Sequence, residues 1–422
     1  MKVLMIGGGG REHALIKKIK ESPRVEAVYC APGNGGISCD AQCFPVSATD
    51  IPGVLALAEQ LKPDLVFVAP DDPLAAGMVD ALEEKGFRAF GPRANAAQIE
   101  ASKVFSKNLM KKYGIPTAGY EVFSDPAAAL SYIREQNRFP AVIKADGLAL
   151  GKGVIIAEDL GAAEEGVRTI MEDKLFGESG SRVVVEEFIT GPEVSVLAFT
   201  DGKTVCPMVS SMDHKRALDG DRGLNTGGMG TISPNPYYTE EMAERCRKEI
   251  FEPTIAAMRA EGRPFKGCLY FGLMFTKDGP KVIEYNARFG DPEAQVVLPR
   301  LKTDIMDIID VILEERLNTL PIEWEDNACA CVIMASGGYP GSYEKGKEIT
   351  GLDENGQAPG AVVYHSGTKR EKGAFYTNGG RVLGVTAKGG ALAEALENAY
   401  RAVEGIRFEG AHYRRDIGKK KF

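Results

Sequence analysis

The sequence predicts an α/β protein that begins with a Rossmann-like open sheet of parallel strands. Two observations lead to this prediction. Over residues 1–92, short apolar runs typical of buried strands alternate with helical patterns, and such alternation favours a parallel sheet with right-handed crossovers. Four consecutive glycines also follow the first apolar run, at the strand-to-helix turn where sheets of this kind bind ligands.

The elements of the first part follow the changes in the apolar pattern. We expect strand 2–6, helix 12–20, strand 25–30, helix 52–61, strand 64–69, helix 75–85, a short strand ending at 89–90, and one helix over 94–113. From residue 114 the pattern changes to an α+β type. There we expect strands 141–144, 154–157, 183–188, 194–199, 282–285 and 328–335, and helices 159–172, 240–261, 303–316 and 392–404.

Composition excludes several classes of function. The chain has 51 basic and 59 acidic residues and a net charge of −8, which argues against non-specific binding to nucleic acid. It shows no run of 18 apolar residues and no signal peptide, so we expect neither a membrane span nor export. Its eight cysteines form no C-x-x-C pair and no zinc pattern, which favours free thiols in a reducing cytoplasm.

The first chemical motif is the run of glycines at positions 7–10, which precedes Arg11-Glu12-His13. Backbone N–H groups in such a turn, beside a helix start, attract anions. Neither frame of G-x-G-x-x-G finds its third glycine, and no acidic residue ends the second strand, which disfavours NAD. Another phosphate-bearing ligand is the favoured interpretation, and a purely structural tight turn is the alternative.

Two further segments favour a nucleotide site. Lys144 ends a predicted strand, and a glycine-rich loop with Lys152 follows; the Walker A pattern fails because Gly153 comes next. A lysine flanked by glycines can still move over phosphates. Further on, an apolar strand runs into Glu186 and Glu187 and then bends. Backbone groups in such a bend can bind an adenine edge, although a solvated strand end is the simpler alternative.

The segment around Glu284 points to a metal. Glu284 and Asn286 face the same side of a strand, because side chains alternate with period two. Their hard oxygen atoms suit Mg²⁺, which also binds water and substrate phosphates. If the strand continues, Arg288 lies on that face too and can bind a carboxylate. A ladder of cross-strand salt bridges is the alternative interpretation.

A polar cluster, Asp213-His214-Lys215, precedes the glycine-rich run N-T-G-G-M-G at 225–230. We expect both on a loop, and loops carry function more often than packing. His214 taken alone is more readily explained as a structural residue.

In this order, the lysine strand, glycine loop, acidic bend and E-x-N-x-R resemble the ATP-grasp superfamily. Three runs narrow the resemblance: G-x-G-G-R-E-H-A at the N-terminus, the Asp213 cluster with its glycine-rich run, and N-A-R-F-G-D-P-E at 286–293. Over essentially its whole length the chain is similar to the phosphoribosylamine–glycine ligase (glycinamide ribonucleotide synthetase) family of purine biosynthesis.

The resemblance implies three domains: residues 1–101 (Rossmann-like), 102–325 (ATP-grasp, with a mobile lid at about 120–190) and 326–422 (mixed α/β). It implies an ATP-dependent, Mg²⁺-requiring C–N ligase, with Mn²⁺ as a second usable metal. The expected substrates are glycine and 5-phosphoribosylamine, joined through glycyl phosphate. The enzyme would be a cytoplasmic monomer that binds no nucleic acid and no membrane.

Residue roles are carried over from matching positions. Those expected to bind ATP are Lys103, Lys144, Lys152, Glu186, Phe188 and Glu193, and those expected to bind the metal are Glu284 and Asn286. Asp213, Lys215 and Arg288 match catalytic and substrate positions, and the substrate site is completed by Gly7, Gly9, Gly10 and Gly290. At Asp71 the family usually has a glutamate, so no role is assigned there.

Other functions fit less well. An NAD-dependent oxidoreductase would be expected to have the third glycine of G-x-G-x-x-G, which this chain lacks. A non-catalytic nucleotide sensor would not need intact Lys103, Lys144, Glu284 and Asn286. Within the superfamily, a carboxylase or a formate-using ligase is the nearest alternative, and the Asp213 cluster favours the glycine ligase.

Overall fold

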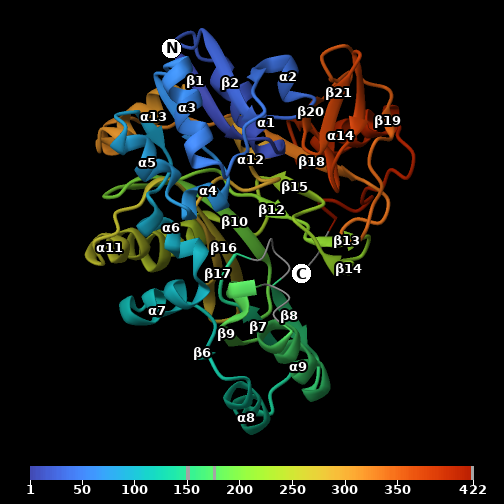
Figure 1. The fold of residues 1–422 in the computed structure, drawn as a ribbon. Coiled ribbons are helices and arrows are strands. Elements are labelled where there is room, and N and C mark those ends of the chain that lie inside the picture. The colour runs from blue at the N-terminus through green and yellow to red at the C-terminus, as the bar shows by residue number, and fades with distance from the viewer. Residues whose placement is uncertain (149–152, 174–176, 420–422) are drawn as a thin grey trace.

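The computed structural model describes residues 1–148, 153–173 and 177–419. Figure 1 shows the N-terminal elements at the top, the C-terminal elements at the upper right, and a smaller lobe at the bottom formed by elements between residues 120 and 187. A central sheet lies between the top of the molecule and this lobe. The predicted site residues lie on elements from all of these parts.

The N-terminal part is the predicted open parallel sheet, with strand order β3-β2-β1-β4-β5. Its strands are β1 (Lys2–Gly7), β2 (Ala27–Pro32), β3 (Gln42–Cys43), β4 (Leu65–Val68) and β5 (Ala89–Phe90). Its helices are α1 (Gly10–Lys20), α2 (Ile37–Asp40), α3 (Ile51–Leu61), α4 (Asp71–Ala75) and α5 (Met78–Glu84). The helix expected over 75–85 is present as α5, and Gly77, with φ +89°, separates it from the short helix α4, which was not expected.

The prediction of a single helix over 94–113 is wrong at one residue. Ser102 has an extended backbone and separates α6 (Ala94–Ala101) from α7 (Lys103–Tyr113). Its hydroxyl accepts the Phe105 N–H at 3.1 Å and so caps α7, as serine commonly does at helix starts. The same hydroxyl donates to Asp146 Oδ1 at 2.9 Å, which fixes α7 against the lobe.

The lobe is a four-stranded antiparallel sheet with strand order β6-β9-β7-β8 and two covering helices. Its elements are β6 (Tyr120–Phe123), α8 (Pro126–Gln136), β7 (Ala141–Ala145), β8 (Val154–Ala157), α9 (Leu160–Val167) and β9 (Val183–Glu187). Ile143, Ile170 and Val183 belong to an apolar core that this lobe does not share with the rest of the protein.

The central sheet has strand order β11-β10-β16-β17 and is antiparallel. Its strands are β10 (Glu193–Asp201), β11 (Val205–Pro207), β16 (Lys266–Thr276) and β17 (Gly279–Asn286). The long helix expected over 240–261 is present as α10 (Glu240–Cys246), a π-helical stretch and α11 (Glu252–Ala260). The helices α12 (Ala294–Val297) and α13 (Ile305–Leu313) follow the sheet.

The C-terminal sheet has strand order β12-β15-β18-β23-β20. Its strands are β12 (Met212–Asp213), β15 (Gly230–Ser233), β18 (Ala328–Ala335), β20 (Val362–His365) and β23 (Arg381–Gly389), and α14 (Leu392–Gly405) packs against it. Smaller sheets hold β13 (Arg216–Leu218) with β14 (Arg222–Asn225), and β19 (Glu348–Ile349) with β21 (Thr368–Glu371) and β22 (Ala374–Thr377). Among the described residues, no helix combines the length and apolar character that a membrane span requires.

The cap at Ser102 gives a test of local stability. We expect Ser102→Ala to lower the free energy of unfolding by about 1–2 kcal/mol, because the Phe105 N–H loses its acceptor. Urea unfolding followed by circular dichroism measures the change. Ser47→Ala, in an exposed loop, is the matched control and should change stability by less than about 0.5 kcal/mol. Equal stabilities for the two variants would contradict the capping role.

Candidate active site

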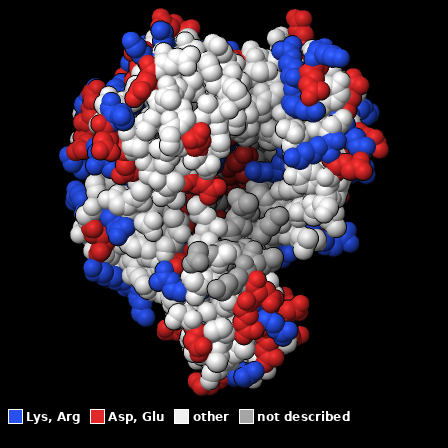
Figure 2. All heavy atoms as spheres, in the orientation of Figure 1, with Lys and Arg blue, Asp and Glu red and all other residues white. Residues whose placement is uncertain are grey.

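The predicted site residues lie on elements that meet around the centre of the molecule. β17 carries Glu284 and Asn286, β12 ends at Asp213, and β7 and α7 bring Lys144 and Lys103 from the side of the lobe. Figure 2 shows the face of the molecule that is turned to the viewer in Figure 1. This face is hollowed at its centre, with acidic side chains in the hollow and basic side chains at its edge.

Glu284 is the centre of a group of lysines. Lys215 Nζ lies 3.2 Å from Glu284 Oε1. The charge of Lys215, with smaller contributions from Lys144 and Lys103, lowers the pKa of Glu284 to about 2 although burial opposes this shift. The carboxylate is therefore ionised at neutral pH and lies among three cations, the kind of charge that attracts a polyanionic ligand.

Lys144 and Glu186 form a buried pair. Lys144 Nζ lies 2.9 Å from Glu186 Oε1 and donates to the Ile283 carbonyl at 3.3 Å. Lys107 binds the other carboxylate oxygen of Glu186 at 2.9 Å. Burial lowers the pKa of Lys107 to about 8, and Glu186 opposes this effect. Lys107 has no motif of its own in the sequence and was not predicted.

The other predicted nucleotide residues lie around this pair. Lys103 donates to the Gly147 carbonyl at 2.9 Å, at the start of the glycine-rich loop. Phe188 is exposed just beyond β9, and Glu193 begins β10 opposite Met274. Lys152 lies outside the described residues.

The predicted metal ligands are two side chains with hard oxygen atoms. Glu284 and Asn286 flank Tyr285, which is buried, so both side chains leave the other face of β17. In the described part of the chain, no group of three or more His, Cys, Asp or Glu residues could hold a metal ion. One carboxylate and one amide oxygen fit Mg²⁺, because this ion takes its remaining ligands from phosphates and water.

Arg288 lies beyond the end of β17 and is already paired. Its Nη2 is 2.9 Å from Glu100 Oε1 and 3.9 Å from Asp71 Oδ2. Burial raises the pKa of Glu100 to about 7, and the charge of Arg288 opposes that rise. Neither acid was predicted as a site residue. No role was assigned to Asp71, but the structure places its carboxylate beside Arg288, and although burial opposes the shift, the charge of Arg288 lowers the pKa of Asp71.

Asp213 and Glu293 form an acidic group beside Lys215. Burial and the charge of Glu293 raise the pKa of Asp213, and burial also raises the pKa of Glu293. Glu293 Oε1 accepts a hydrogen bond from Ser195 Oγ at 3.4 Å, and Ser195 contacts the Tyr270 hydroxyl at 2.9 Å. Gly228 (φ +114°) packs closely against Asp213. A Cβ on this residue would lie 2.6 Å from Asp213 Oδ1, so a larger residue would not fit there.

Carboxylates of the protein already occupy part of the glycine turn. The Gly9 N–H donates to Glu12 Oε2 at 2.7 Å, and the Arg11 N–H donates to Asp291 Oδ2 at 3.4 Å. Gly290 lies against the Glu293 carboxylate, without room for a Cβ. The structure thereby brings the four predicted glycines together beside the carboxylates of Glu12, Asp291 and Glu293, and not beside the lysine group; these glycines are Gly7, Gly9, Gly10 and Gly290.

Three segments of the chain resemble the three domains of one known protein family. Residues 1–100, 101–294 and 329–420 match the N, ATP-grasp (A) and C domains of phosphoribosylglycinamide synthetase. A phosphoribosylamine–glycine ligase of Caldanaerobacter subterraneus is 49% identical over 417 residues, with 99% of each chain covered. The crystal structure of a phosphoribosylamine–glycine ligase from Thermotoga maritima has a TM-score of 0.87 at 33% identity, covering 99% of this chain and 100% of that one.

A more distant likeness concerns the fold alone. The biotin carboxylase domain of a Hydrogenobacter thermophilus 2-oxoglutarate carboxylase, solved with MgADP and bicarbonate, has a TM-score of 0.74 at 17% identity, covering 98% of this chain and 91% of that one.

His214 gives a test of the electrostatics. The ring is buried; Gly418 donates its N–H to Nε2 at 3.0 Å, and Nδ1 lies 3.2 Å from the Gly230 carbonyl. These partners require a neutral ring, and burial lowers its pKa to about 4. Because the unfolded chain binds the proton first, stability is full above about pH 6.5 and is lost as the pH falls towards 4.

We expect His214 to account for about 2 kcal/mol of the stability lost between pH 7 and pH 5. Urea unfolding of the wild type and of His214→Gln at both pH values measures it. The variant should be less stable at pH 7 but should lose less on acidification. Equal losses in the two proteins would contradict this assignment.

Proposed function

Because the chain belongs to the phosphoribosylglycinamide synthetase family, it is an ATP-dependent ligase that forms a C–N bond, and we propose that it joins glycine to 5-phosphoribosylamine through glycyl phosphate. The relatives named above are phosphoribosylamine–glycine ligases. The products would be glycinamide ribonucleotide, ADP and phosphate, in purine biosynthesis.

The observation that carries the phosphoryl-transfer part is the lysine group around Glu284. A carboxylate does not react directly with an amine, so its oxygen must first become part of a good leaving group. Phosphorylation achieves this, and catalysis then depends on positioning and on stabilising charge on the transferred group. Lys103, Lys144 and Lys215 supply positive charge around one carboxylate, which suits the phosphates of ATP.

Glu284 and Asn286 would hold Mg²⁺, or Mn²⁺ in its place, which neutralises phosphate charge when bound. Glu186 and Phe188 would contact adenine chiefly through their backbone, and Glu193 would bind the ribose. In the structure Lys144 is paired with Glu186, so we propose that ATP draws Lys144 from this pair to its phosphates. The lid at about 120–190, with Lys152, would close over them.

The glycine and sugar sites are proposed on the acidic side of the lysine group. The glycine carboxylate would replace Glu100 as the partner of Arg288, which would then orient it. Asp213 and Lys215 would hold the rest of glycine. The glycine turn, with Gly290, would bind the sugar phosphate. The unpaired state of all eight cysteines is consistent with a cytoplasmic location, and we propose a monomer.

Lys144 gives the first test of this proposal. We expect Lys144→Ala to weaken ATP binding roughly 10–150-fold, because a charge-assisted hydrogen bond contributes about 1.5–3 kcal/mol. Isothermal titration calorimetry with a non-hydrolysable ATP analogue measures the affinity, and circular dichroism verifies folding. The control is Lys203→Ala, an exposed lysine paired with Glu315, which should bind as the wild type does. Unchanged affinity in folded Lys144→Ala would contradict the phosphate contact.

The intermediate is tested by following one oxygen atom. In the proposed route a glycine oxygen attacks the γ-phosphorus, and the amine of 5-phosphoribosylamine then displaces phosphate from the acyl carbon. The released phosphate must therefore keep one oxygen of glycine. With ¹⁸O in the glycine carboxylate, mass spectrometry should find ¹⁸O in the phosphate. Unlabelled phosphate, formed together with the amide product, would exclude glycyl phosphate.

A further inference from the structure

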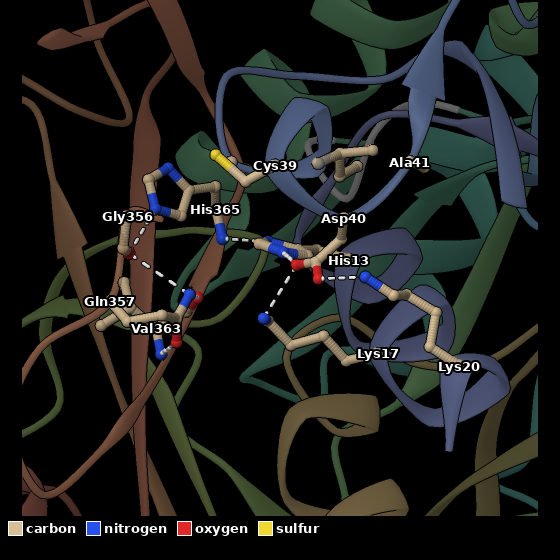
Figure 3. A network of polar contacts seen from close by, with 12 residues as sticks. His13, Lys17, Lys20, Cys39, Asp40, Ala41, Gly356, Gln357, Val363 and His365 are labelled. Carbon is tan, nitrogen blue, oxygen red and sulfur yellow. Dashed lines mark hydrogen bonds and ion pairs between the residues drawn. The ribbon is translucent and has the colours of Figure 1, made fainter. Parts of the chain in front are cut away.

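A polar network joins the N-terminal and C-terminal parts of the chain (Figure 3). His13, in the first turns of α1, is fully buried and accepts the backbone N–H of His365 through Nδ1 at 2.8 Å. Its Nε2 lies 3.0 Å from Asp40 Oδ2. These contacts fix the tautomer, because Nδ1 must carry no proton and Nε2–H must donate to Asp40.

The surroundings keep this ring neutral. Asp40 also binds Lys17 and Lys20, each at 2.8 Å. Burial lowers the pKa of His13; the Asp40 hydrogen bond opposes this effect, and the charges of Lys17 and Lys20 add to it. Protonation of Nδ1 would place two N–H groups face to face, so the neutral ring preserves the link to His365.

Asn34 holds the other polar group of the His365 backbone. Its Nδ2 donates to the His365 carbonyl at 2.7 Å and to the Gly8 carbonyl at 2.9 Å. One side-chain amide therefore connects the glycine turn to the end of β20. His13 and Asn34 together bind both the N–H and the C=O of His365, and we call this arrangement the His365 clamp.

The His365 clamp leaves the residue it holds little freedom to shift. The His365 ring contacts the Gly356 carbonyl at 2.8 Å and Thr368 Oγ1 at 3.0 Å, and Gly36 lies against it without room for a Cβ. The next residue, Ser366, approaches the start of α1, since its Oγ lies 2.6 Å from where a Cβ of Gly10 would be. This Oγ is buried without a hydrogen-bond partner in the described part of the chain.

We propose that His13 is a positioning residue for the sugar substrate: through the His365 clamp it holds the turn at Ser366 against Gly10 and thereby sets the affinity for 5-phosphoribosylamine. His13 itself touches neither substrate nor metal. The inference rests on the proposed function, because it takes the glycine turn to be the place where the sugar phosphate binds.

Two substitutions separate the two nitrogens of His13. The amide of Asn reaches the position of Nδ1, so His13→Asn can still accept the His365 N–H. The amide of Gln reaches the position of Nε2, so His13→Gln keeps the contact with Asp40 but leaves the buried His365 N–H without an acceptor, which is costly. A role in packing alone predicts no difference between the variants in substrate affinity.

Steady-state kinetics with each substrate varied in turn tests the proposal. We expect His13→Gln to raise KM for 5-phosphoribosylamine roughly 10-fold or more, with KM for ATP and for glycine unchanged, and His13→Asn to stay within about 3-fold of the wild type. Lys20→Ala, which removes a contact with Asp40 and leaves the clamp intact, is the control and should match the wild type.

A second variant covers the case in which His13→Gln does not fold. Asn34→Asp removes the Nδ2 donor with little change of shape and should give the same selective rise in KM. Equal KM values for the sugar in the two His13 variants, or equal rises for all three substrates, would overturn the positioning role. A wild-type protein that forms no ADP in response to glycine and 5-phosphoribosylamine would instead overturn the proposed function.

Discussion

One half-buried carboxylate, that of Asp291, joins the three parts of the chain, and the geometry of the site depends on it. Its Oδ2 accepts the Arg11 N–H at the start of α1, and its Oδ1 accepts the amide of Gln295 at 2.8 Å. From the C-terminal sheet, Arg381 lies 3.5 Å from Oδ2. Burial alone would raise the pKa of Asp291, but the charges of Arg381 and Arg11 lower it. The glycine turn, α12 and β23 therefore share one ionised anchor, and a shift of any of them would cost a hydrogen bond or an ion pair.

Around this anchor the charges separate into two neighbouring environments. The lysines near Glu284 gather positive charge in one place, whereas Asp213 and Glu293 form an acidic group that resists full ionisation. A phosphoryl donor suits the first environment, and a substrate that carries an ammonium or amine group suits the second. Lys215, next to both, lies where the two would meet. The pairing of Lys144 with Glu186, and of Arg288 with Glu100, means that these cations are kept satisfied inside the protein, so a ligand must compete with an internal carboxylate.

Local sequence patterns were sufficient to predict much of the fold, but they predicted fewer of the contacts between side chains. The buried strand at 2–6 and the alternation over residues 1–92 were sufficient to predict the parallel sheet, because β1, β2, β4 and β5 are mostly apolar runs. The edge strand β3 was missed, because its two residues, Gln42 and Cys43, form no such run. The motifs around Lys144, Asp213 and Glu284 located the residues that cluster. Lys107, Glu100 and Arg381 were missed because each acts on a partner 79, 188 or 90 residues away, and nothing in the adjacent sequence indicates such a partner. Arg288 was expected on the same face as Glu284 and Asn286 only if the strand continued to it, and β17 ends at Asn286.

The C-terminal sheet has an implication for how this chain can be divided. Its strands β12 and β15 belong in sequence to the central unit, yet β15 pairs with β18 along four residues, from Gly230 to Ser233. A fragment cut before β18 would therefore carry a fully apolar strand, Ala328–Ala335, with one edge open to solvent. Such edges recruit strands from other molecules and lead to aggregation. Modular exchange or recombination of the C-terminal region would have to carry residues 212–233 with it, or supply a replacement edge strand.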